Sequence, residues 1–271
     1  SFIKTLKAAF NQTINPYELI VVDSSKNKKI TSIIKSFKNK KIKHIKIDKS
    51  FPGRARNIGV LKSSGNIIAF LDSKTIPLSD WLKNSVKILL KDNYDIVFGM
   101  TKYVPDQNKQ KLFSTFIYGN ISHESTPGTV MLKNKYLNTC GFIENARAAE
   151  DIEWRDRLKK DLNYFIPHHF CTIYKEVPKS FFNFLSKFFI YSFHTSKISV
   201  QKNIKNFYFF IFIILSALII PQWNYLIGEG GWTKDPLYIP NITKIYLIFI
   251  LVLLFYKYIF NFIKSNKKEN L

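Results

Sequence analysis

Residues 64–72 (SGNIIAFLD) decide the fold class of this 271-residue chain. A polar turn leads into a short apolar run that ends in Asp72. An apolar run of this length bounded by turn residues is typical of a buried strand, and the aspartate stands where the strand opens into a loop. Two positions later the chain has Lys74, where a second carboxylate would have completed a paired-acid cation site.

Outward from this stretch, the first 180 or so residues alternate between helical and strand patterns. We predict helices at residues 2–10, 30–37, 56–63 and 81–90, and strands at 17–22, 42–47, 66–71 and 94–98. Helix alternating with buried strand indicates an α/β sheet, in which ligands bind at the carboxyl ends of the strands. Asp23 and Asp72 each follow such an end.

The charge of the chain restricts its partners. Lysine and arginine number 41 against 19 aspartates and glutamates, which gives a formal net charge of +22. This excess suits an anionic partner, such as a phosphorylated substrate, a nucleic acid or an anionic membrane face, although a general lysine bias would also produce it. No nucleic-acid-binding motif is recognisable, so we expect no nucleic acid partner.

Cys140 and Cys171, the only cysteines, form neither a disulfide framework nor a zinc ribbon.

Two apolar stretches near the end of the chain predict transmembrane helices. Residues 207–227 contain no charged residue, and Lys257 is the only charged residue in 245–263. Each stretch has about the 20 residues needed to cross a bilayer. The connection between them carries one lysine, Lys234, whereas both outer flanks are basic, so the positive-inside rule places both flanks in the cytoplasm.

The organisation that follows has three parts. Residues 1–179 form the α/β domain, and residues 180–203 contain an aromatic stretch (SFFNFLSKFFIYSFH) typical of an amphipathic helix lying on the bilayer surface. A buried core helix is the alternative for this stretch. Residues 204–271 contain the two predicted spans, a short outer loop and a basic tail. We therefore expect a multi-pass protein of the inner cell membrane with its α/β domain in the cytoplasm.

Several charged residues have the types and positions needed for chemistry on a phosphorylated substrate. Asp23 can accept a hydrogen bond at the first strand end. The segment 53–59 (GRARNIG), interpreted as a glycine-flanked turn, offers the guanidinium groups of Arg54 and Arg56 to phosphates. Glu150 and Asp151 are adjacent acids at the start of a predicted helix, whose dipole stabilises their negative charge.

Five segments together resemble family 2 glycosyltransferases of the GT-A fold, over residues 1 to about 175. In chain order they are 17–25 (YELIVVDSS), 53–59 (GRARNIG), 64–72 (SGNIIAFLD), Pro77 with Trp81-Leu82, and Gly141-Phe142 with Glu150-Asp151 and Arg157. The resemblance implies transfer of a sugar from a nucleotide-sugar donor with inversion at the anomeric carbon. It also implies a GT-A (Rossmann-like) nucleotide-sugar-binding domain as the α/β part of the chain.

Residue by residue, the resemblance implies roles for the matched positions. Asp23 matches the base-binding aspartate, and Asp72 matches the first acid of the Asp-x-Asp motif. Asp151 matches the catalytic base, preceded by Glu150 in the Glu-Asp motif. Arg56 and Asn57 match an Arg-Asn pair beside the donor pocket, although packing at a helix start explains Asn57 equally well.

The sequence departs from the family pattern at two places. The chain begins in the helix that normally follows the first strand, so we expect an N-terminally incomplete domain that binds donor poorly. The motif reads Asp72-Ser73-Lys74 where a second acid is usual, which weakens attraction for Mg²⁺ or Mn²⁺. Three alternatives remain: Lys74 itself neutralises the leaving group, Asp72 alone holds a weaker metal site, or the protein is a non-catalytic GT-A binding protein.

The sequence thus predicts a membrane-anchored inverting glycosyltransferase acting on a lipid-linked or saccharide acceptor in surface polysaccharide synthesis. A polyprenyl-phosphate glycosyltransferase is the alternative enzyme. Its phosphate acceptor needs no general base, so the Glu150-Asp151 pair argues against it.

Overall fold

A computed structural model describes residues 2–27, 29–37, 39, 41–105, 115, 118–119, 121–178, 180–196, 198 and 211. The chain separates into two compact units, residues 1–200 and 201–271. The predicted spans at 207–227 and 245–263 lie outside the described residues, apart from Ile211. Among the residues that are described, none of the helices combines the length and apolar character required to cross a bilayer.

The first part of the domain contains a small parallel sheet with three helices. Strand β1 (Leu19–Asp23) pairs with β2 (Ile42–Lys46), in register from Leu19 opposite Ile42 to Asp23 opposite Lys46. The helices are α1 (Phe2–Phe10), α2 (Lys29–Ser36) and α3 (Pro52–Leu61). The predicted turn at residues 53–59 is wrong, because these residues form the body of α3. Pro52 at the helix start explains the difference, since its fixed φ favours the first turn of a helix.

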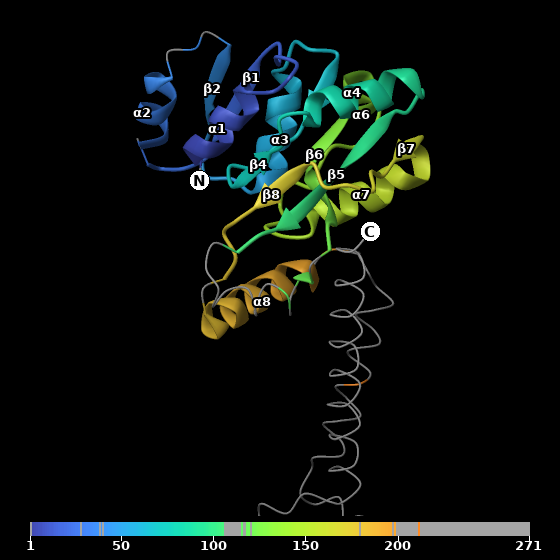
Figure 1. Ribbon diagram of the computed structural model, residues 1–271. Coiled ribbons are helices and arrows are strands. Elements are labelled where there is room, and N and C mark those ends of the chain that lie inside the picture. Colours follow the sequence, from blue (N-terminus) through green and yellow to red (C-terminus); the bar gives the residue numbers. More distant parts are fainter. Residues whose placement is uncertain are drawn as a thin grey trace, which may run out of the picture. The chain divides into compact units, whose positions relative to one another are not determined.

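A larger sheet of six strands forms the centre of the domain (Figure 1). Its order is β3-β6-β5-β8-β4, with β7 paired to β5. The strands are β3 (Ile67–Ala69), β4 (Thr75–Pro77), β5 (Ile96–Tyr103), β6 (His123–Leu132), β7 (Tyr164–Phe165) and β8 (Thr172–Tyr174). The sheet is mixed, because β6 runs antiparallel to β3 and β5, whereas β5 is parallel to β7 and β8.

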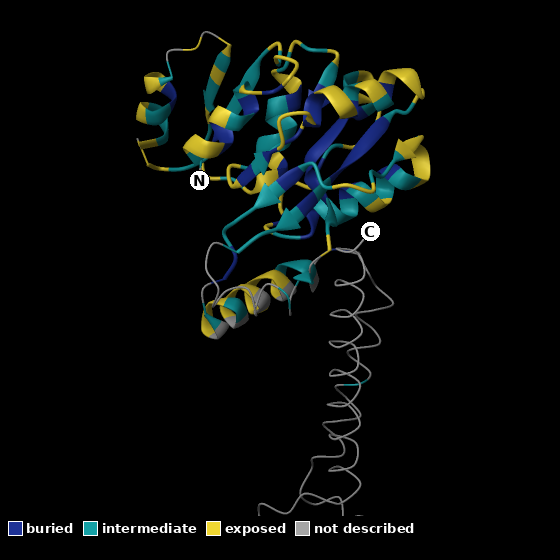
Figure 2. Cartoon of the chain, in the orientation of Figure 1, coloured by how far each residue is buried: buried dark blue, intermediate teal, exposed yellow. Residues whose placement is uncertain are grey.

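Side chains of β5 point alternately to the two faces of the sheet, so the core has two layers. Ile96 and Phe98 pack with Trp154 on one face, whereas Val97 packs with Trp81 on the other. Successive strand residues point to opposite faces, so both faces of this central strand are covered. The covering helices are α4 (Trp81–Lys91), α6 (Lys133–Leu137) and α7 (Glu150–Asp161). Figure 2 shows the central strands as the most deeply buried part of the domain.

The small sheet is less protected than the large one. The apolar residues of β1 are only half-buried, and β2 is the strand paired with β1 in the described part of the chain. Helix α3 packs against β1 through Gly59, whose added Cβ would touch Val22, and against the large sheet through Val60. Helix α3 therefore contacts strands of both sheets and carries the segment 53–59 between them.

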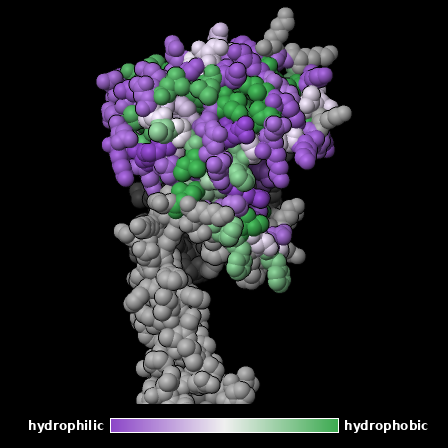
Figure 3. All heavy atoms as spheres, turned by 180° about the vertical axis from the view of Figure 1, so that it is seen from behind, coloured by the Kyte–Doolittle hydropathy of each residue, from purple (hydrophilic) through white to green (hydrophobic). Residues whose placement is uncertain are grey.

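Helix α8 (Phe181–Ser196) lies near the end of the described part of the domain. It leaves several large side chains in water, including Phe182 at 78 %, Phe189 at 70 % and Phe193 at 60 % exposure. Its other side contacts the domain, because the His194 ring lies 6.1 Å from that of Phe51. A helix is therefore present in the predicted segment, and its position on a bilayer surface stays a prediction. Its exposed aromatic side chains contrast with the mostly hydrophilic surface seen in Figure 3.

Candidate active site

Arg56 joins two of the predicted site carboxylates. From α3 its Nη1 donates a hydrogen bond to Glu150 at 2.8 Å, and its Nη2 donates to Asp72 at 3.0 Å. Asp72 follows β3 and Glu150 begins α7, so these contacts bring three separate elements together. The guanidinium also lies 5.1 Å from the centre of the Phe142 ring, a cation–π contact. The predicted strand-end acid and the Glu-Asp motif thus belong to one site.

The Arg56–Glu150 pair is largely shielded from water, whereas Asp72 is not. The side chains of Arg56 and Glu150 are 13 % and 5 % exposed, whereas that of Asp72 is 43 % exposed. Burial opposes the charge of Arg56, but Asp72 and Glu150 outweigh it and raise the pKa of the guanidinium. Burial also raises the pKa of Glu150, against the lowering influence of Arg56. A buried carboxylate of this kind depends on its cation partner.

Asp151 is the more accessible acid of the pair, with one third of its side chain exposed. It stands in the first turn of α7, where the helix dipole favours negative charge. Arg155, one turn later, lies 3.9 Å from Asp151 and 3.5 Å from Glu124. Glu124 also accepts a hydrogen bond from Lys159 at 2.7 Å. Asp151 is therefore held beside fixed charges while it stays accessible to a substrate.

The backbone before this motif has an unusual conformation. Ala149 has φ of 66°, in the left-handed region that a residue with a side chain rarely adopts. It is 5 % exposed and packs with Ala146 and Ile198. Strained residues held by packing are frequent at functional sites. Here the strain lies at the residue that sets the direction of Glu150 and Asp151.

Asn57 binds the loop before α7 rather than pointing into open space. Its Oδ1 accepts hydrogen bonds from the Phe142 N–H at 2.8 Å and from the Tyr136 hydroxyl at 2.6 Å. Its Nδ2 donates to the Phe142 carbonyl and to Glu144, both at 2.9 Å. Gly141 is required beside it, because an added Cβ would come within 2.6 Å of the Asn57 oxygen. Direct contact between Asn57 and a donor stays a prediction.

Asp23 lies at the carboxyl end of β1, as predicted, and is buried. Its carboxylate accepts hydrogen bonds from the Ser25 N–H at 2.8 Å and from Lys46 at 2.9 Å, and His44 lies 3.4 Å away. Burial works to raise the pKa of Asp23, but the bonds from Ser25 and Lys46 prevail and lower it to about 2. The side chain is therefore an ionised acceptor at neutral pH.

A basic pocket of about 450 Å³ opens beside Asp23. Its lining includes four cationic side chains, from Lys26, Lys46, Lys49 and Arg54. Arg54 is exposed and lies 4.0 Å from Glu144. Clustered lysine and arginine donors of this kind suit a phosphate group. Of the two predicted arginines, Arg54 lines the basic pocket, and Arg56 lies between the carboxylates of Asp72 and Glu150.

Lys74 forms an ion pair with Glu176, which follows β8. The two side chains are 50 % and 38 % exposed, so the pair lies at the surface. Within the described ranges, no group of three or more His, Cys, Asp or Glu side chains could hold a metal ion. Asp72 already shares one oxygen with Arg56. These residues fit a paired-acid Mg²⁺ or Mn²⁺ site poorly.

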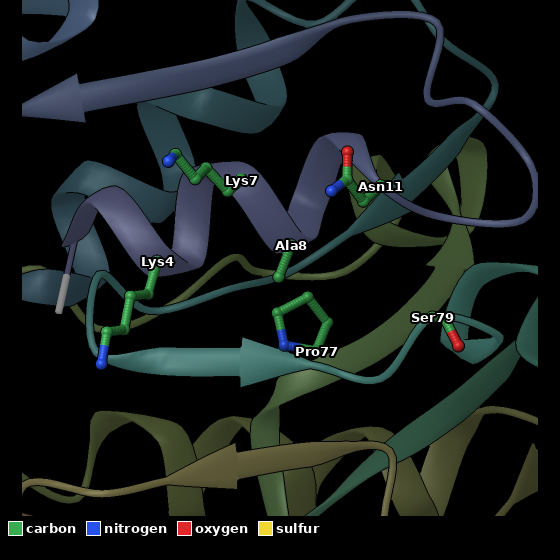
Figure 4. A pocket seen from close by; sticks show the side chains of 6 residues that line it. All are labelled: Lys4, Lys7, Ala8, Asn11, Pro77 and Ser79. Carbon is green, nitrogen blue, oxygen red and sulfur yellow. The ribbon is translucent and has the colours of Figure 1, made fainter.

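Another shallow pocket, of about 360 Å³, lies between α1 and β4 (Figure 4). Its lining includes Lys4, Lys7 and Pro77, and none of the predicted site residues. It is therefore separate from the site around Arg56.

Sequence reasoning missed three charged residues of the site. Arg155 follows Asp151 by four positions on a helix, a spacing that brings side chains together and could have revealed it. Lys46 meets Asp23 through the pairing of β1 with β2, at a sequence separation of 23 residues. Glu124 of β6 meets Lys159 through the packing of α7, at a separation of 35 residues. Local sequence carries no signal for such contacts.

Comparison with known proteins agrees with this geometry. Residues 2–153, more than half of the chain, match the family described as Glycosyl transferase family 2. The chain belongs to this family of enzymes, which transfer sugars from nucleotide-sugar donors.

Two relatives show how far the similarity extends. A protein of Rickettsia bellii described as an uncharacterized glycosyltransferase is 29 % identical over 164 residues, which are 55 % of this chain and 23 % of that protein. Another, from Methanocaldococcus jannaschii, is 26 % identical over 223 residues, 75 % of this chain and 76 % of that protein. The chain therefore spans only about a quarter of the first relative.

Solved structures confirm the α/β fold as GT-A-like. The crystal structure of Staphylococcus aureus TarS residues 1–349 in complex with UDP-GlcNAc superimposes with a TM-score of 0.52 and 17 % identity. The match covers 66 % of this chain and 56 % of that one. At this identity the likeness concerns the fold.

Proposed function

We propose that this protein is an inverting glycosyltransferase in which Asp151 is the general base. The Asp151 carboxylate takes the proton from an acceptor hydroxyl, and the hydroxyl oxygen attacks the anomeric carbon of the sugar. The bond from that carbon to the diphosphate oxygen breaks, and the nucleoside diphosphate leaves. The observation that carries the proposal is the Arg56 bridge, which unites the donor-side Asp72 with the Glu150-Asp151 motif.

The donor takes its place between Asp23 and Asp72. The ionised Asp23 accepts a hydrogen bond from the nucleoside, and the cationic side chains of the adjacent pocket receive the diphosphate. Fixed cations can stabilise the charge of a leaving diphosphate. A divalent cation would have Asp72 as its protein ligand, but the acid set fits it poorly, so we assign the charge stabilisation to the chain's own lysines and Arg54.

The acceptor is a lipid-linked or polymeric saccharide at the cytoplasmic side of the inner membrane. Three observations support this. Helix α8 exposes a row of aromatic side chains, the chain carries a net charge of +22, and the sequence at 207–227 and 245–263 has the composition of membrane spans. The TarS relative is described as a poly(ribitol-phosphate) beta-N-acetylglucosaminyltransferase, an enzyme named for a polymeric acceptor.

A donor screen tests the proposal. The full chain, solubilised in detergent, is incubated with a panel of uridine, guanosine and thymidine diphosphate sugars, and release of the nucleoside diphosphate is measured with and without Mn²⁺. We expect hydrolysis of at least one donor, with little dependence on Mn²⁺. No release from any donor would favour a non-catalytic binding protein. Transfer to a polyprenyl phosphate that survives loss of Asp151 would favour the alternative enzyme.

A further inference from the structure

Four aromatic rings gather where β5, β6 and β8 come together. Tyr103 is the last residue of β5, Tyr174 is the last residue of β8, and His123 is the first residue of β6. The Tyr118 ring stacks on that of Tyr103, with centroids 3.9 Å apart and an angle of 4°. Tyr174 and His123 lie 5.5 Å and 5.7 Å from the Tyr103 ring. We call these four residues the aromatic platform.

Strand register places the platform on one face of the sheet. Tyr103 pairs with Tyr174 in the parallel ladder, and Thr101 pairs with His123 in the antiparallel ladder. Paired residues point to the same side, and Thr101 and Tyr103 share a face because they are two positions apart. The Thr101 hydroxyl lies 2.6 Å from both the Ser125 and Thr172 hydroxyls, which fixes the base of the platform. The rings therefore stand on a rigid support.

The platform lies near the two acids of the active site. Burial raises the pKa of Tyr103, and Tyr118, Tyr174 and then the negative charge of Asp151 raise it further. Burial also raises the pKa of Tyr174, to about 12, with smaller contributions from Glu176 and Asp72 among others. Tyr174 pairs with Thr75 of β4, whose hydroxyl donates a hydrogen bond to the Asp72 carbonyl at 2.9 Å. The platform therefore borders the strand end that carries Asp72.

The chemistry of the platform suits a sugar ring. Its members are half-buried, so their surfaces are partly open to solvent. Tyrosine combines an apolar ring face with a hydroxyl group, and a sugar combines C–H faces with hydroxyl edges. The raised pKa values keep the hydroxyls of Tyr118 and Tyr174 protonated to about pH 12, so they donate and accept as neutral groups.

The aromatic platform suits a phosphate group less well than a sugar ring. Among the described residues, the cation–ring contacts involve Phe142, Phe170 and Phe98, and none involves a platform ring. Arg155, the cation that lowers the pKa of Tyr103, is already paired with Asp151 and Glu124. The platform therefore offers apolar faces and neutral hydroxyls rather than positive charge.

We propose that the aromatic platform of Tyr103, Tyr118, His123 and Tyr174 binds a sugar ring of the acceptor and presents one of its hydroxyls to Asp151. The inference rests on the proposed glycosyltransferase function and narrows its acceptor to one that carries a sugar at the reacting end, rather than a bare lipid phosphate.

Direct binding tests the platform without turnover. The full chain, in a zwitterionic detergent that lacks a sugar head group, is mixed with octyl β-glucoside, octyl β-galactoside or octyl β-N-acetylglucosaminide, and saturation-transfer NMR is recorded. We expect saturation of the ring C–H protons of at least one glycoside. In Tyr103→Ala and Tyr174→Ala the dissociation constant should rise about tenfold, because a stacked aromatic surface is lost.

Tyr164→Ala is the matched control. Tyr164 is a 38 % exposed tyrosine of the same sheet, but β7 pairs with the opposite end of β5. This variant should bind the glycoside as the wild type does, and Tyr174→Phe should bind nearly as well because it keeps the ring. Circular dichroism verifies that each variant is folded. The proposal would be overturned if Tyr103→Ala and Tyr174→Ala bound the glycoside as tightly as the wild type does. It would also be overturned if the wild type gave no saturation of the glycoside ring protons.

Donor hydrolysis separates this inference from the proposed function. Hydrolysis is measured on the wild type in the absence of acceptor, independently of glycoside binding. If no donor is hydrolysed by the wild type, the proposed function is contradicted, and the NMR result still decides the platform. If farnesyl phosphate displaces the glycoside and Tyr174→Ala weakens its binding about tenfold, the platform would be assigned to a lipid phosphate and the inference would be overturned.

Discussion

Arg56 donates a hydrogen bond to Glu150 at 2.8 Å across 94 residues of sequence. The same guanidinium bonds Asp72, so one buried cation holds the strand end after β3 and the start of α7 at a fixed separation. Without this cation, Glu150 would be a buried carboxylate with no opposite charge beside it. The bridge is therefore both a stabilising element and the feature that assembles the site.

Removing the bridge should destabilise the domain. Arg56→Ala leaves the Glu150 carboxylate buried without its partner, a change that typically costs about 3–5 kcal/mol. Arg54→Ala is the control, because Arg54 lies on the same helix but is exposed, and it should cost less than about 0.5 kcal/mol. Urea unfolding measures both. The combination Arg56→Met with Glu150→Gln should recover much of the loss. A cost for Arg56→Ala no larger than that for Arg54→Ala would contradict the bridge.

Asp23 should make stability depend on pH. Its pKa is lowered to about 2 in the folded protein, below its ordinary value of 3.8. It therefore contributes stability that is complete above about pH 4 and is lost as the pH falls toward 2. Asp23→Asn lacks this contribution, so it should be less stable by about 1–2 kcal/mol at pH 7. Urea midpoints of the two proteins should converge as the pH is lowered from 5 to 3, and a constant difference would argue against the ionised carboxylate.

Variants of Lys74 test whether donor hydrolysis is independent of metal because Lys74 replaces the second acid of the Asp-x-Asp motif. Lys74→Asp would place a carboxylate between Asp72 and Glu176, and three acids with a diphosphate can hold a hard cation. We expect this variant to require Mn²⁺ for donor hydrolysis and to be inhibited by EDTA. Lys83→Asp, at an exposed position of α4, should not acquire this requirement. Inhibition of the wild type by EDTA, with no change in Lys74→Ala, would instead show that Asp72 binds metal alone.

The exposed aromatic face of α8 should bind anionic membranes. Replacement of Phe182, Phe189 and Phe193 by serine removes the apolar surface that would enter the lipid interface. A chain truncated after residue 203 isolates this contact from the predicted spans. We expect it to sediment with vesicles of phosphatidylglycerol at low salt and less at high salt, and the triple variant to remain in solution.

The control for this experiment removes exposed leucines elsewhere. Leu61 and Leu90 are 67 % and 62 % exposed, on α3 and α4. Leu61→Ser with Leu90→Ser should leave vesicle binding unchanged. Equal loss in both variants would show that general surface hydrophobicity, and not α8, causes the attachment.

The sequence predicted the local features of this molecule well. The strands before Asp23 and Asp72, and the helix that begins at Glu150, depend on apolar runs and periodicity that lie within a few residues. The resemblance to family 2 glycosyltransferases is confirmed by the family match. Strand β3 is shorter than predicted, at Ile67–Ala69, although the Phe70 N–H still donates to the Thr129 carbonyl at 2.9 Å.

What the sequence did not predict depends on contacts between distant segments. Arg56 was expected to face phosphates, and nothing near it in the sequence indicates that two carboxylates surround it. The partner of Lys74 is 102 residues away, in a segment after β8. Strands β7 and β8 have two and three residues, which is too short for periodicity to identify. Tertiary packing decides all of these features.

The most direct test of the account is the rate of sugar transfer by Asp151→Asn. The amide has the shape of the carboxylate but cannot accept the acceptor's proton, so the rate should fall by about 10² to 10⁴. Binding of the donor that the wild type hydrolyses should be nearly unchanged, and Asp156→Asn, at an exposed position of the same helix, should keep full activity. Transfer by folded Asp151→Asn at the wild-type rate would contradict the assignment of Asp151 as the general base.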